Sequence, residues 1–156
     1  MESTDKKYLS KEKYKELQEE LRVLTTDKRK EIAEQLEYAK SLGDLSENAE
    51  YHEARDVQAK LEARIREIET ILKVATIVSG KQHSKVAVGS SVTIKNNDTK
   101  EQEEWHIMGS EEADLEMHKI SNESPLGESL MEKSVGDIAE ITTRKGKTTY
   151  TIVAIK

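Results

Sequence analysis

The chain has 156 residues, of which 36% are charged and 35% hydrophobic, and its net charge is -6. This composition is lean for one compact core, so we expect part of the chain to form an extended coiled coil. The absence of cysteine excludes disulfides and thiolate metal sites, and the lack of a basic half argues against a protein that coats nucleic acid.

The first predicted element is a helix that Ser10 can cap. Its apolar residues are spaced three and four apart, as in a coiled-coil seam: Tyr14, Leu17, Leu21 and Leu24. The register slips before the next seam residues, Ile32, Leu36 and Ala39, as a local eleven-residue interval produces. We therefore expect a local change of supercoil between Leu24 and Ile32.

A second helical segment keeps the alternation of three and four throughout. Its seam consists of Tyr51, Ala54, Gln58, Leu61, Ile65, Ile68, Leu72 and Ala75. Two such stripes bury each other when the helices fold back antiparallel, and Gly43 suits the positive φ that follows a helix end. A parallel coil between two chains is the alternative, which Gly43 and the register change disfavour. We expect a monomer.

The polar residues 79–84 end the heptad pattern and are typical of a linker. Short β-branched runs follow at residues 86–88, 92–94, 105–108, 138–142 and 149–153. Ser124 and Pro125 can begin a short helix. The sequence therefore predicts an α+β protein: a coiled-coil hairpin at residues 1–78 with its tip at 42–48, a linker, and a small antiparallel β domain with one short helix at residues 85–156.

The tip of the predicted hairpin carries two carboxylates, Asp44 and Glu47. They have the spacing of a capping box, in which an acceptor and an acid three residues later satisfy amides at a helix start. They can also hold a divalent cation, because Mg²⁺ usually takes one or two protein carboxylates besides water and substrate phosphates. A capping amide occupies only part of one oxygen, so the residues alone leave both roles open.

The segment GDLSENAEYHEAR, residues 43–55, resembles the tip signature of the bacterial Gre family of transcript cleavage factors. The resemblance implies an N-terminal hairpin and a C-terminal domain of FKBP-like fold. Such factors bind bacterial RNA polymerase and pass the hairpin through its secondary channel when backtracking has extruded the RNA 3′ end. On this interpretation Asp44 and Glu47 help to hold a Mg²⁺ ion within the polymerase complex only, and the chain activates RNA hydrolysis without turnover of its own.

The resemblance also implies roles for residues beside the tip. Asn48 is a candidate third catalytic residue that orients water or phosphate, although asparagine is ordinary near a helix start. Lys40 and Arg55 match the family's basic patch facing the extruded RNA, and their alternative role is as solvated surface charges. Ser46 stands where some members carry a basic residue, which favours action on shallow backtracking.

Glu123, Ser124 and Pro125 correspond to the loop by which the family's C-terminal domain grips the helical rim of the secondary channel. The alternative is a helix start with no further role. Glu128 stands where a basic residue is usual, and Glu132 where glycine is usual. These departures concern the strength of docking and leave the tip chemistry untouched.

Two other functions stay open at this point. One is a secondary-channel inhibitor of RNA polymerase, which the intact tip signature disfavours. The other is a coiled-coil adaptor unrelated to polymerase, in which Asp44 and Glu47 are caps only. No stretch of eighteen apolar residues and no apolar segment of a signal peptide are present, so we expect a cytoplasmic protein without membrane contact.

Overall fold

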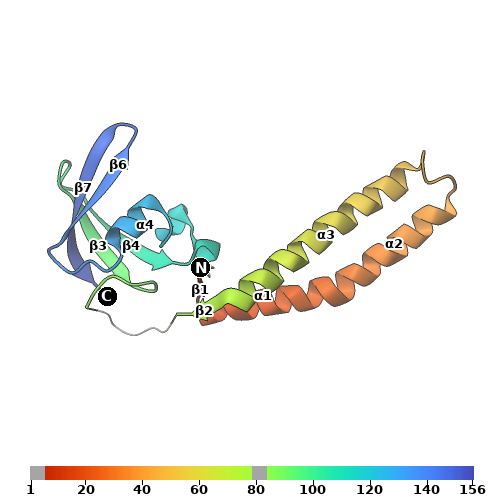
Figure 1. Ribbon diagram of the computed structural model, residues 1–156, viewed down its shortest axis with the longest axis horizontal. Helices are drawn as coiled ribbons and strands as arrows, with labels where there is room; N and C mark the ends of the chain where they lie inside the picture. The colour runs from red at the N-terminus through yellow and green to blue at the C-terminus, as the bar shows by residue number, and fades with distance from the viewer. Residues whose placement is uncertain (1–5, 79–83) are drawn as a thin grey trace, which may run out of the picture. The chain divides into compact units, whose positions relative to one another are not determined.

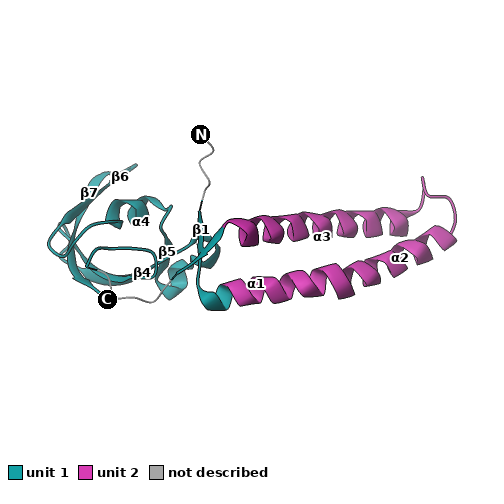
Figure 2. Ribbon diagram, turned by 60° about the horizontal axis from the view of Figure 1, so that its bottom comes forward, with its two compact units in different colours: residues 1–13, 75–156 teal, residues 14–74 magenta. Residues whose placement is uncertain are grey.

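The computed structural model describes residues 6–78 and 84–156. It has two compact units, one of residues 1–13 and 75–156 and the other of residues 14–74 (Figure 2). The second unit is thus inserted between two stretches of the first. This grouping differs from the predicted division at residue 78, because short segments on both sides of the hairpin join the C-terminal domain. Of the predicted linker, only Ser84 lies within the described residues.

The inserted unit is the predicted helical hairpin (Figure 1). Its elements are α1 (Lys11–Val23, which begins in the other unit), a π-helical segment (Leu24–Lys28), α2 (Arg29–Ser41) and α3 (Ala49–Val74). The predicted seams are confirmed by the buried core of this unit, which comprises Ile32, Leu36, Ala54, Leu61 and Ile65. At the end of α3 the pattern differs, since Ile71 is buried, Leu72 only half-buried, and Ala75 already begins a strand.

The π-helical segment explains the register slip that the sequence predicts. A π turn holds one more residue than an α turn, so the apolar stripe returns to face α3 one residue later than a regular helix would allow. The hydroxyls of Thr25 and Thr26 donate to the carbonyls of Leu21 and Arg22, at 2.8 and 2.7 Å. The two hydroxyls thus supply hydrogen-bond donors to carbonyl oxygens of the widened turn. The predicted register slip is therefore confirmed, and the predicted change of supercoil stays a prediction.

Two short strands, β1 (Lys7–Leu9) and β2 (Ala75–Ile77), pair in parallel where the chain enters and leaves the hairpin. The backbone of β1 passes so close to Gly109 that a Cβ there would overlap the carbonyl oxygen of Tyr8. Ser10 caps α1, as predicted, and its hydroxyl and amide also donate to the Glu112 carboxylate at 2.6 and 2.9 Å. The N-terminal strand is thus an integral part of the C-terminal domain.

The C-terminal domain is built on one five-stranded sheet of order β5-β4-β3-β7-β6. The strands are β3 (Ser91–Asn96), β4 (Gln102–Met108), β5 (Lys119–Ser121), β6 (Ile138–Thr143) and β7 (Gly146–Ile155). Three pairings are antiparallel, as predicted, but β4 and β5 are parallel. The parallel pair arises because the connection between them, which holds two 3₁₀ turns (Ser110–Glu112 and Leu115–Met117), crosses over instead of forming a hairpin.

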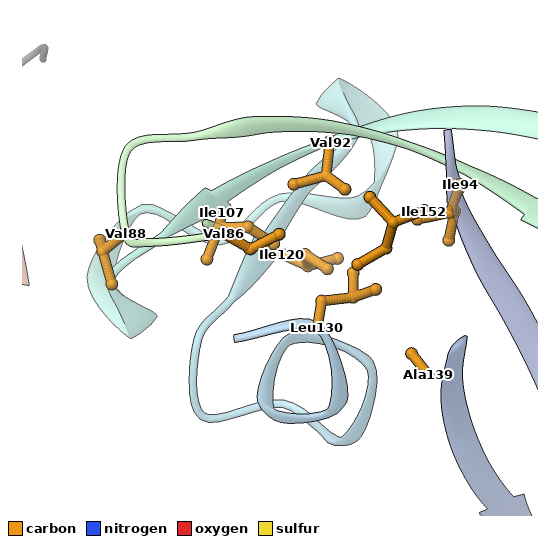
Figure 3. Packing of buried hydrophobic residues seen from close by; sticks show 9 residues of the cluster. All are labelled: Val86, Val88, Val92, Ile94, Ile107, Ile120, Leu130, Ala139 and Ile152. Atoms are coloured by element: carbon orange, nitrogen blue, oxygen red, sulfur yellow. The ribbon is translucent and has the colours of Figure 1, made fainter. Parts of the chain in front are cut away.

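One short helix, α4 (Pro125–Leu130), packs on this sheet and completes the predicted α+β fold. Figure 3 shows Leu130 of this helix directed at the buried aliphatic side chains, among them Ile120 and Ile152. Val86 and Val88 belong to the same core. Their predicted strand is absent, because the backbone of residues 86–88 is irregular and the two side chains alone are buried.

Candidate functional site at the hairpin tip

The turn between α2 and α3 begins with a glycine. Helix α2 ends at Ser41, its C-cap residue Leu42 is still in the right-handed region, and Gly43 follows with φ of 131°. This value is one that side chains with a Cβ rarely adopt, which confirms the role predicted for Gly43. The chain then makes a tight turn through residues 45–47 before α3 begins at Ala49.

Asn48 ties the two helices together at this turn. Its side-chain oxygen accepts a hydrogen bond from the amide of Tyr51 at 3.0 Å, which makes Asn48 the N-cap of α3. Its side-chain nitrogen donates to the carbonyl oxygen of Ala39 in α2 at 2.6 Å. Both ends of the amide are thus bonded within the hairpin, and Asn48 is a positioning residue of the tip. Its predicted catalytic role stays a prediction.

Asp44 and Glu47 lie exposed beside this cap. One oxygen of Asp44 accepts from the amide and the hydroxyl of Ser46, at 3.1 and 3.0 Å. Glu47 forms no hydrogen bond or ion pair with any residue that the structure describes. The capping-box interpretation of this pair is therefore wrong, because Asn48 occupies the cap position. The second oxygen of Asp44 and both oxygens of Glu47 face solvent without a partner among the described residues.

The two carboxylates line an open hollow at the apex together with Asn48, Ala49, Glu50 and Leu42. Within residues 6–78 and 84–156, no group of three or more His, Cys, Asp or Glu side chains is arranged to hold a metal ion. Carboxylate oxygens are hard ligands, of the kind that Mg²⁺ accepts when water and phosphates complete its shell.

The predicted basic residues flank the tip on one side of the hairpin. Arg29 of α2 forms a two-pronged ion pair with Glu62 of α3, at 2.8 and 2.9 Å. Lys40 follows Arg29 by three helical turns and Arg55 precedes Glu62 by two, so both lie on this flank. Lys40 is exposed and forms no ion pair in the described part of the chain, while Arg55 donates only to Gln58, at 2.8 Å.

Tyr51 has the role in the seam that its heptad position predicts. It is half-buried and packs on the core of the hairpin. Its ring also meets that of His52 edge-on, at 5.8 Å between centroids. The side chain is therefore part of the packing that supports the tip.

The predicted docking residues lie in the other unit, between β5 and α4. Ser124 caps α4, accepting from the amide of Gly127 at 3.1 Å, and Pro125 is the first residue of the helix. The Glu123 carboxylate lies 3.7 Å from the ammonium group of Lys7 in β1, and that group also donates to Ser110. The predicted helix start is confirmed. No sequence pattern indicated that β1 would reach this segment.

Comparison with known proteins connects both units to transcription. Residues 7–77 match the family model described as "Transcription elongation factor, N-terminal", and residues 81–156 match that described as "Transcription elongation factor, GreA/GreB, C-term". The chain belongs to the GreA/GreB family. The N-terminal match begins at the first residue of β1 and ends at the last residue of β2, so it covers the hairpin with both of its flanking strands.

Several GreA proteins resemble the chain over nearly its whole length. Transcription elongation factor GreA of Clostridium botulinum (strain Langeland) is 48% identical over 98% of both chains, and that of Clostridium acetobutylicum is 48% identical over 99% of both. GreA of Chloroherpeton thalassium is 44% identical over 98% of both. Among solved structures, GreA factor homolog 1 (Gfh1) of Thermus thermophilus is 28% identical, with 97% of this chain and 99% of that chain covered and a TM-score of 0.45.

None of the helices described for this GreA/GreB family member is both long and apolar enough to cross a membrane.

Proposed function

We propose that this chain binds bacterial RNA polymerase, enters its secondary channel with the hairpin tip and stimulates cleavage of backtracked RNA 3′ ends. Membership of the GreA/GreB family supports transcription elongation as the process and RNA polymerase as the partner. The observation that carries the finer proposal is the pair of exposed carboxylates, Asp44 and Glu47, at the apex of a long hairpin. One oxygen of Asp44 and both oxygens of Glu47 have no hydrogen-bond partner among the residues that the structure describes.

The tip residues fit a shared Mg²⁺ ion as partial ligands. Asp44 and Glu47 would hold the ion together with groups of the polymerase, since the tip alone lacks a full ligand set. When bound, Mg²⁺ lowers the pKa of a coordinated water and polarises a phosphoryl oxygen. The hydrogen bonds from Ser46 to one Asp44 oxygen limit how this carboxylate can rotate, and its other oxygen has no partner among the described residues.

The remaining residues orient this pair and the RNA. Asn48 fixes the turn against α2 and α3, so that the carboxylates are presented by a braced element and not by a loose loop. Lys40 and Arg55 on one flank would attract the extruded RNA backbone, because phosphates favour nearby cations. In the C-terminal domain, Glu123, Ser124 and Pro125 would grip the rim of the channel. The chain would therefore act as an activator of the polymerase and have no turnover alone.

The experiment is RNA cleavage in a stalled, backtracked bacterial polymerase complex with Mg²⁺. We expect the Asp44→Asn/Glu47→Gln variant to lose stimulated cleavage by about 100-fold, since ligands to a catalytic metal are removed, and to keep its affinity for polymerase. The matched control is Glu34→Gln/Glu37→Gln, which neutralises two exposed acids of α2 away from the tip and should cleave like the wild type.

Three results would contradict the proposal. Loss of polymerase binding in the double variant would make the tip a docking element. Undiminished cleavage by that variant would remove the two carboxylates from the reaction. Slowed nucleotide addition without any cleavage by the wild type would identify an inhibitor instead.

A further inference from the structure

The flank of the hairpin opposite to Lys40 and Arg55 carries a hollow of ≈ 410 Å³ between α2 and α3. Its lining residues are Gln35, Tyr38, Ala39, Glu50, Glu53, Ala54 and Val57. Tyr38 is 63% exposed and Val57 41% exposed, whereas Leu36, Ala39 and Ala54 in the same part of the hairpin are buried. An exposed aromatic and an exposed aliphatic residue beside one hollow are features of a contact surface.

The charges around the hollow indicate what it contacts. Glu50 and Glu53 line it, no basic residue does, and neither acid forms an ion pair with a described residue. Two unpaired carboxylates repel phosphate, so this flank is unsuited to RNA. They also disfavour a second copy of the same face, which would bring like charges together. A basic protein surface bearing apolar side chains fits both the charge and the exposed ring.

We propose that this hollow, lined by Tyr38, Val57 and Glu53, docks on a basic wall of the polymerase channel while the opposite flank faces the RNA. This inference rests on the proposed function, because it assigns a protein contact to the hairpin that enters the channel. One flank would contact protein and the other RNA. Tyr38 lies two residues from Lys40 on α2, about 200° around the helix, so the ring and the cation point to opposite sides. The hollow adds affinity and sets the rotation of the hairpin about its axis.

The test compares single variants for polymerase affinity and for cleavage at increasing factor concentration. We expect Tyr38→Ala and Glu53→Lys each to raise the dissociation constant and the half-saturating concentration by about 10-fold, while the maximal cleavage rate is kept. Tyr38→Phe preserves the ring and should restore wild-type affinity. Asp56→Lys makes a comparable charge reversal on the same helix, outside the hollow, and should leave affinity unchanged.

Raised salt should reduce the affinity of the wild type more than that of Glu53→Lys, because the variant has lost the attraction that salt screens. Circular dichroism melts of all variants guard against a loss of folding.

The outcomes separate this inference from the proposed function. If the wild type binds polymerase and cleaves, but Tyr38→Ala and Glu53→Lys behave like Asp56→Lys, the hollow is not a docking site and the proposed function stands. If the wild type does not bind polymerase, both fail. If the wild type is a dimer in solution and Tyr38→Ala a monomer, the hollow joins two copies of this chain and the inference is overturned.

Discussion

Asn48 offers a quantitative test of how the tip is built. Replacement by alanine removes the N-cap bond to the Tyr51 amide and the bond to the Ala39 carbonyl. An N-cap is worth about 1 kcal/mol, and a side-chain hydrogen bond about 1 kcal/mol net. The first turn of α3 should therefore open about 2 kcal/mol more easily, which corresponds to a roughly 30-fold faster exchange of its amide hydrogens.

Replacement of Asn48 by aspartate separates the two bonds. Aspartate keeps the capping oxygen and adds a favourable negative charge at the helix start, but it cannot donate to Ala39 and places a carboxylate against that carbonyl. We expect an effect near 1 kcal/mol, between wild type and alanine. The assay is amide hydrogen exchange of the full chain, with the amides in the middle of α3 as internal reference. If the amide hydrogen of Tyr51 exchanges at the same rate in Asn48→Ala and in the wild type, Asn48 does not brace the tip.

Two further predictions concern the body of the hairpin. Deletion of Thr26 should convert the π turn into a regular helix, because the interval from Leu24 to Ile32 then becomes a heptad. Thermal melting of this variant should show a folded hairpin. A one-residue deletion in the middle of α3, which breaks a regular seam, should instead lower the melting temperature. The hydrogen bond from Arg29 lowers the pKa of Glu62 from its usual 4.5. The stability that the Arg29–Glu62 pair contributes is therefore present above pH 4.5 and lost as the pH falls through the lowered pKa. The difference in melting temperature between wild type and Glu62→Gln should disappear in acid. A difference that persists in acid would contradict the stabilising role of this ion pair.

The long elements could be predicted from sequence because their patterns are repeated many times. The two apolar seams, the slip before Ile32, the positive φ of Gly43 and the Ser124 cap all follow from local spacing. The three-residue strands β1, β2 and β5 were missed. A strand of that length has too few residues for an alternation to show, and β1 and β2 are brought together only by the hairpin between them.

The tip shows a different limit of sequence reasoning. Asp44 with Glu47 has the spacing of a capping box, while Asn48 with Tyr51 three residues later forms the observed cap. Asp44 and Asn48, the two candidate N-caps, lie within five residues of the chain, and both residue types are favoured at that position. The carbonyl of Ala39 near the end of α2 favours Asn48, because the amide of Asn48 donates a hydrogen bond to it and an ionised carboxylate could not. The acidic pair lies outside this cap and is exposed.

The parallel pairing of β1 with β2 joins the two ends of the inserted hairpin. Because the two helices pack antiparallel along a repeating seam, their ends stay side by side whatever the number of repeats. Whole heptads could thus be added to or removed from both helices while the strand pair and the C-terminal domain stay as they are. The length of the hairpin can therefore change, by evolution or by design, without any change to the fold of the C-terminal domain.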